Sequence, residues 1–236
     1  MITVNGIEVQ VVRKDIKNLH LAVYPPDGRV RVAVPRHITD DNVRLAIVSS
    51  LRWIKKQQKD FAGQPRQSER KYVSGECYYF LGRRYRLQLI ERVGKHEIKL
   101  LKSGRLKMFV NPSTSVINKE ILLYAWYREE LKKLVPSLLE KWQPIVGKKT
   151  SDWNVRKMKT KWGSCNYKAH TIRLNTELVK KPAECLEYII VHELVHLLER
   201  NHNDKFIVLM NRFMPKWRAH RDELNSLPVS HTDWGY

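Results

Sequence analysis

Cysteine is scarce in this chain, and the segments that mark secreted or membrane proteins are missing. The 236 residues include 3 cysteines, Cys77, Cys165 and Cys185, without CxxC spacing. Their odd number argues against a disulfide framework. No charged-then-apolar leader follows Met1, and no apolar run approaches the roughly 18 residues that span a bilayer. We therefore expect a cytoplasmic protein with reduced thiols and no membrane partner.

Acidic residues are few relative to basic ones, with 24 Asp+Glu against 44 Lys+Arg and a formal net charge of +20. Residues 1–110 contain 23 of the basic and 10 of the acidic residues, so the first half carries most of the excess. Such a charge attracts polyanions, and nucleic acid is the usual partner. The alternative is a basic surface with no dedicated partner, because no recognisable DNA-reading motif occurs in it.

Part of this basic half interleaves arginines with aromatic residues. The stretch contains Tyr78, Tyr79, Phe80, Arg83, Arg84, Tyr85, Arg86 and Arg92. This composition is typical of surfaces that bind single-stranded nucleic acid, but half-buried strands show it as well. Both interpretations stay open.

The pattern of short runs predicts an α+β protein with two domains. Alternating apolar and polar residues between 2 and 34, and again between 77 and 110, indicate strands separated by glycine-containing turns. A helix from Thr39 or Asp40 to about Gln58 lies between the two sets. The segment 111–115 is the predicted boundary, giving a basic β-rich domain with one helix at 1–112 and a second domain at 113–236. No internal repeat is evident.

The second domain contains the motif H-E-x-x-H at residues 192–196, with a further histidine at 202. On a helix, His192 and His196 lie one turn apart on the same face, where two imidazoles can bind one zinc ion, and Glu193 lies near the open coordination side. If the helix ends after Arg200 and Asn201 adopts a left-handed conformation, His202 becomes the third ligand. A fourth position is then left for water, as in catalytic zinc sites. The alternative is that these histidines only pack or cap a buried helix.

A predicted strand at 171–175 precedes this helix and is expected to form the rim of a cleft. An unpaired strand edge there would bind an extended peptide through backbone hydrogen bonds. We therefore predict substrate contacts from Ile172, Leu174 and Asn175. Tyr188, one helical turn before His192, is a candidate donor to the developing oxyanion, or else a core residue.

The motifs Trp162-Gly163-Ser164-Cys165, Ile172-Arg173-Leu174-Asn175, His192-Glu193-Leu194-Val195-His196 and Asn201-His202 resemble the YgjP-like metallopeptidase family, which is related to the SprT/Spartan-like proteases. The resemblance implies a zincin-like metallopeptidase domain, one zinc ion (Zn2+) and hydrolysis of peptide bonds. By position it implies zinc ligation by His192, His196 and His202, with Glu193 as the catalytic carboxylate.

One departure concerns the third ligand. Metzincins share the histidine spacing but have glycine where this chain has Glu199, so the turn must form differently. His220 or Glu223 from the last helix is the alternative third ligand.

These observations predict a zinc metallopeptidase that acts on a protein or peptide substrate, with Glu193 as general base for a zinc-activated water. The family's relatives suggest substrates that are associated with nucleic acid. The alternative function is a nucleic-acid-binding module with a structural zinc site and no peptidase activity. Closed structural zinc sites generally use four protein ligands rich in cysteine, and we expect only Cys165 as a conceivable thiol ligand here.

Overall fold

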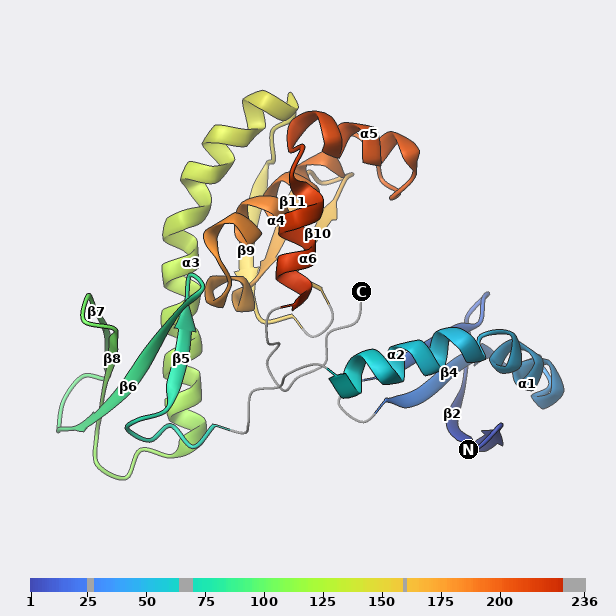
Figure 1. Cartoon of the computed structure of the whole chain (residues 1–236), viewed down its shortest axis with the longest axis horizontal. Coiled ribbons are helices and arrows are strands. Elements are labelled where there is room, and N and C mark those ends of the chain that lie inside the picture. The colour runs from blue at the N-terminus through green and yellow to red at the C-terminus, as the bar shows by residue number, and fades with distance from the viewer. Residues whose placement is uncertain (25–27, 64–69, 159–160, 227–236) are drawn as a thin grey trace. The chain divides into compact units, whose positions relative to one another are not determined.

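The computed structural model describes residues 1–24, 28–63, 70–158 and 161–226. Helices and mixed sheets alternate along the chain (Figure 1), which confirms the α+β prediction. The chain divides into two units, Met1–Ser68 and Glu69–Leu227, rather than at the predicted position near residue 112. None of the helices in the described ranges combines the length and apolar character needed to span a membrane.

The first unit contains a four-stranded sheet and two helices. Its strands are β1 (Ile2–Val4), β2 (Ile7–Lys14), β3 (His20–Tyr24) and β4 (Arg29–Pro35), in the order β1-β2-β4-β3. Alternation along β4 buries Val30, Val32 and Val34, as expected for a sheet with one face in a core. The helices are α1 (Asp40–Ser49) and α2 (Leu51–Gly63). Thr39 caps α1 by accepting a hydrogen bond from the backbone N–H of Asn42.

The second unit begins with another four-stranded sheet. Its strands are β5 (Cys77–Phe80), β6 (Arg83–Glu91), β7 (Glu97–Leu101) and β8 (Arg105–Val110), in the order β5-β6-β8-β7. Helix α3 (Val116–Val146) follows and packs against this sheet. The Tyr127 hydroxyl on α3 donates a 2.9 Å hydrogen bond to the carbonyl of Tyr79, and the Leu81 N–H donates one of 2.7 Å to the carbonyl of Val179. These bonds explain why the sheet belongs to the second unit and why the division precedes it.

The two sheets are structural repeats separated by 76 residues. Both pair the first two strands antiparallel, the second and fourth parallel, and the third and fourth antiparallel. Gly6 and Gly28, both with positive φ, correspond to Gly82 and Gly104, since 82 − 6 and 104 − 28 both equal 76. The expectation that the chain has no internal repeat is therefore wrong.

The helix that follows each sheet begins at an equivalent position. Ser115 accepts a hydrogen bond from the N–H of Asn118 at the start of α3, and it lies 76 residues after Thr39, the cap of α1. The repeats therefore preserve turns and caps, where backbone conformation restricts the residue type, more than they preserve the strands.

A smaller sheet supports the metal motif. It contains β9 (Asp152–Arg156), β10 (Gly163–Asn166) and β11 (Thr171–Asn175), in the order β10-β11-β9. The remaining elements are η1 (Thr176–Lys180), α4 (Ala183–Val195), α5 (Asp204–Phe213) and α6 (Trp217–Ser226). Strand β11 pairs antiparallel with β10 and parallel with β9, so both of its edges are occupied. The prediction of an edge strand at 171–175 is wrong, and β10 lies at the edge instead.

Candidate metal centre

Helix α4 carries the H-E-x-x-H motif into the interior of the second unit. Pro182 precedes its first residue, where a missing N–H costs nothing, and Leu186, Ile190 and Leu194 are at most 1% exposed. The helix ends at Val195, so His196 is the first residue beyond it and keeps a helical conformation. The two histidines of the motif therefore remain one turn apart, as predicted.

Three histidine side chains converge at the end of α4. The Nε2 atom of His192 lies 3.2 Å from that of His196 and 3.0 Å from that of His202, and the last two are 3.1 Å apart. Among the described residues, these three form the group of metal-ligating side chains that could hold an ion. Neither alternative third ligand, His220 nor Glu223, belongs to that group.

The donor set fits a zinc ion. Tetrahedral ligands with Zn–N bonds of 2.0–2.1 Å lie about 3.3 Å from one another, close to the separations of the three Nε2 atoms. Burial lowers the pKa of His192 to about 3, with smaller contributions from the two neighbouring histidines, and burial also lowers the pKa values of His196 and His202. The imidazoles are therefore neutral at pH 7, which is the form that binds metals.

The other ring nitrogens of the motif histidines are buried or hydrogen-bonded. His196 Nδ1–H donates to the carbonyl oxygen of Glu199 at 3.0 Å, which leaves the lone pair on Nε2. His192 Nδ1 is buried and has no hydrogen-bond partner in the described part of the chain. For both rings, the Nε2 atom is the one directed at the shared centre.

The turn that brings His202 back differs from the predicted one. The helix ends five residues before Arg200, and Asn201 is not among the residues with positive φ. The longer turn needs no left-handed residue, because the Glu199 carboxylate accepts a 3.2 Å hydrogen bond from the N–H of Asn201. This hydrogen bond is the main reason that the pKa of Glu199 lies below its ordinary value. The residue that replaces the metzincin glycine thus stabilises the turn itself.

Glu193 is on α4, and its side chain lies against Gly163 of the edge strand β10. Its side chain is 3% exposed, and burial raises its pKa to about 8, against a smaller lowering by Lys161. A Cβ atom built at Gly163 would lie 2.5 Å from Glu193 Oε1, 2.9 Å from Cγ and 3.0 Å from Cδ. The missing side chain of Gly163 therefore makes room for the Glu193 carboxylate. Sequence reasoning included Gly163 in a motif but assigned it no role, although a glycine inside a strand often marks a close approach.

Phe206, on α5, packs against all three histidines. Its ring centroid lies 5.0 Å from that of His192, 4.8 Å from that of His196 and 4.7 Å from that of His202, and the residue is 2% exposed. Sequence reasoning gave it only a place in the core. The available signal was its position four residues after His202, one turn further along the chain.

Tyr188 lies beside the histidines, as predicted from helical periodicity. Its ring makes an edge contact with His192, with the centroids 5.8 Å apart, and stacks on Trp217 at 6.3 Å. It is 4% exposed.

The other predicted substrate contacts are interior residues. Ile172, Leu174 and Asn175 are completely buried, because β11 is the central strand of its sheet. Asn175 Nδ2 donates hydrogen bonds to the carbonyl oxygens of Met158 at 3.0 Å and Lys161 at 2.7 Å. These bonds fix the backbone of Met158 and Lys161, which precede β10. The three residues support the edge strand rather than line a cleft.

Three convergent imidazoles, with a buried carboxylate next to the first of them in the sequence, are typical of metal-dependent hydrolases. Residues 17–227 match the model of the YgjP-like metallopeptidase domain, and the chain therefore belongs to this metallopeptidase family.

Two solved structures are similar to part of the chain. The metallopeptidase zymogen abylysin of Pyrococcus abyssi is 25% identical, with 38% of this chain and 90% of that chain covered and a TM-score of 0.36. The metallopeptidase zymogen jannalysin of Methanocaldococcus jannaschii is 28% identical, with coverage of 38% and 89% and a TM-score of 0.33. A search of curated proteins found no match.

Proposed function

We propose that this protein is a zinc-dependent metallopeptidase in which His192, His196 and His202 bind one zinc ion and Glu193 is the general base. The observation that carries the proposal is the convergence of three neutral Nε2 atoms within 3.2 Å of one another, with the buried carboxylate of Glu193 on the helix that carries His192. Three protein ligands leave a position open for chemistry, whereas a closed structural site generally uses four. The three-histidine group supports the enzyme over a structural zinc module.

A zinc ion at this site would supply Lewis acidity, lowering the pKa of water to about 7 and polarising the substrate carbonyl. Glu193 then accepts a proton from the water that attacks the scissile carbonyl carbon and delivers it to the leaving amine nitrogen. Burial alone favours the neutral form of Glu193, and a zinc ion bound nearby would favour the carboxylate form that accepts the proton. Edge strand β10, next to Glu193, is suited to bind an extended peptide substrate, the role predicted for β11.

We extend the proposal to a class of substrate on the basis of charge. A net charge of +20 supports substrates that are bound to nucleic acid, because the protein would be attracted to the polyanion that carries them.

The proposal is tested by Glu193→Gln, which keeps the shape of the side chain and removes its basicity. We expect zinc content to be unchanged and cleavage of a fluorogenic casein or peptide mixture to fall by about 10²- to 10⁴-fold. Glu184→Gln is the matched control, since Glu184 is an exposed carboxylate on the same helix. Cleavage by Glu193→Gln at the wild-type rate would refute the role of Glu193.

A further inference from the structure

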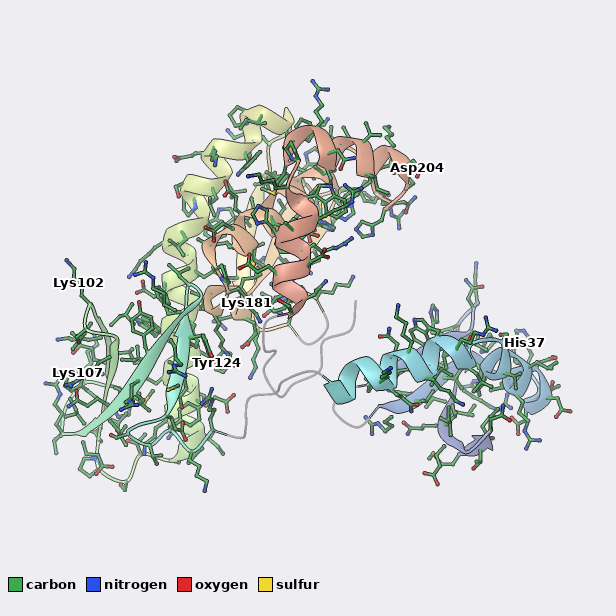
Figure 2. All side chains as sticks on the ribbon, in the orientation of Figure 1. His37, Lys102, Lys107, Tyr124, Lys181 and Asp204 are labelled. Carbon is green, nitrogen blue, oxygen red and sulfur yellow. The ribbon has the colours of Figure 1, made fainter. Side chains whose placement is uncertain are left out.

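The sheet of the second repeat has one face that is unusually basic. Residues 106, 108 and 110 of β8 point into the core, so 105, 107 and 109 lie on the opposite face. Lys107, which is on this face, points away from α3 (Figure 2). Strand pairing brings neighbours from β6 and β7 beside them. We call this surface the basic face. It comprises the cations Arg86, Lys99, Arg105 and Lys107, together with Gln88, Ile90, Glu97, Leu101 and Phe109.

Like charges lie directly opposite one another on the basic face. Arg86 on β6 pairs with Arg105 on β8, and Lys99 on β7 pairs with Lys107 on β8. Like charges in such positions destabilise a sheet. Glu97 forms ion pairs with Arg92 and Lys99, but within the described residues Arg86, Arg105 and Lys107 form none. The like-charged pairs therefore cost stability, and a bound anion would reduce this cost.

The first repeat shows that the fold does not require this charge. The hairpin pairs Thr3–Glu8 and Tyr79–Arg84 align Glu8 with Arg84 at the 76-residue spacing, whereas the pairs Val9–Val30 and Leu87–Leu106 align Glu8 with Arg86 at a spacing of 78. Either alignment places an arginine where the first repeat has an acidic residue.

The third and fourth strands of the second repeat also carry a cation or an aromatic ring where the first repeat has alanine. Ala22 pairs with Arg31 as Lys99 pairs with Lys107, and Ala33 occupies the position of Phe109. The second repeat thus has two cations and an aromatic ring where the first has Glu8 and two alanines. The first repeat keeps cations, Arg29 and Arg31, at the positions of Arg105 and Lys107, so the second copy differs in the cations at 86 and 99 and in the ring at 109.

The shape of the face favours a single strand over a duplex. Four strands spaced about 4.8 Å apart make a backbone surface roughly 14 Å wide, which exceeds the major groove of about 12 Å. Single strands bind flat surfaces where cations contact phosphates and aromatic rings stack on bases. Phe109 is a partly exposed ring among cations, with the Arg92 guanidinium 4.2 Å and the Lys99 ammonium 5.7 Å from its centroid.

We propose that the basic face of the β5–β8 sheet, with the cross-strand pairs Arg86–Arg105 and Lys99–Lys107 beside Phe109, binds single-stranded nucleic acid. This site is separate from the histidine cluster, and its test does not depend on peptidase activity. A failure here would leave the proposed enzyme intact, and a failure of the enzyme would leave this surface intact.

The test measures binding of a labelled 20-nucleotide oligothymidine to the full chain by fluorescence anisotropy over a range of salt concentrations. Three variants install the residue found at the equivalent position of the first repeat: Arg86→Glu, Lys99→Ala and Phe109→Ala. We expect Phe109→Ala to weaken binding at least about fivefold and Lys99→Ala to reduce the slope of log K against log salt by about 0.7. Arg86→Glu should weaken binding while leaving thermal stability unchanged or higher, because it replaces a repulsive pair with an attractive one.

The matched control is Lys55→Glu, an equal charge reversal at an exposed position on α2 in the first unit. It should retain most of the affinity. Equal losses for Lys55→Glu and Arg86→Glu would overturn the proposal, because net charge alone would then explain binding. Duplex DNA of the same length binding as tightly, or poly-glutamate competing as well as oligothymidine, would also overturn it.

Discussion

Replacing Gly163 with alanine would place a methyl group against the carboxylate of Glu193. The new Cβ atom would lie 2.5 Å from Oε1, whereas ordinary contacts are about 3.5 Å, so the carboxylate must move by about 1 Å. A misplacement of 1 Å at a reacting group costs about 10²-fold in rate, or roughly 2.7 kcal/mol of transition-state stabilisation. Gly163 does not have a positive φ, so alanine can adopt its backbone conformation without strain.

We therefore expect kcat of Gly163→Ala to fall by about 100-fold, with metal content unchanged and KM changed much less. Steady-state cleavage of a fluorogenic peptide, metal analysis and thermal unfolding measure the three quantities. Gly147→Ala is the control: it adds a methyl group in open space at the left-handed end of α3, which should cost stability of about 1 kcal/mol and no activity.

A double variant separates this contact from a general effect on the strand. Aspartate at position 193 is one methylene shorter and withdraws from the added methyl group. Gly163→Ala should therefore slow the Glu193→Asp enzyme far less than it slows the wild type. A folded Gly163→Ala protein with wild-type kcat would refute the reasoning about Glu193.

Two further predictions concern the support of the site. Phe206→Ala should lower the free energy of unfolding by about 3–5 kcal/mol and weaken zinc affinity at least 10-fold in a chelator competition, because the ring packs on all three histidines. Phe213→Ala, on the same helix, is the control and should leave zinc affinity unchanged. Burial raises the pKa of Glu177, but its 2.8 Å ion pair with Lys180 and a hydrogen bond from Tyr124 outweigh burial and hold the pKa below its ordinary value. The folded state is therefore stabilised by ionised Glu177 above about pH 4.3, and this stabilisation is lost as the pH falls further. Glu177→Gln should destabilise the protein by about 3–5 kcal/mol at pH 7, as measured by urea unfolding, and by much less near pH 3; an equal loss at both pH values would contradict the role of the ion pair.

The part of the site that sequence could predict is local. His192 and His196 depend only on helical periodicity, and their side chains converge as expected. The turn to His202 was predicted with the wrong geometry, since several residues compete to end a helix and Glu199 supplies a hydrogen bond that no spacing indicates. The side chain of His202 nevertheless lies beside His192 and His196, as the prediction required.

Features that depend on long-range pairing could not be predicted. The central position of β11 comes from its parallel pairing with β9, which joins residues 19 apart, such as Thr171 and Asp152. Ile172, Leu174 and Asn175 were therefore assigned to a cleft when they are buried. The internal repeat escaped detection because its strands differ in sequence, and the signal that was available is the 76-residue spacing of Gly6 and Gly28 from Gly82 and Gly104.

The central claim is that three histidines hold one catalytic zinc ion, and metal analysis of the purified protein tests it most directly. We predict one zinc per chain for wild type and for Glu223→Ala, and loss of zinc for His202→Ala. Zinc retained in His202→Ala but lost in Glu223→Ala would contradict the account, because the third ligand would then come from α6.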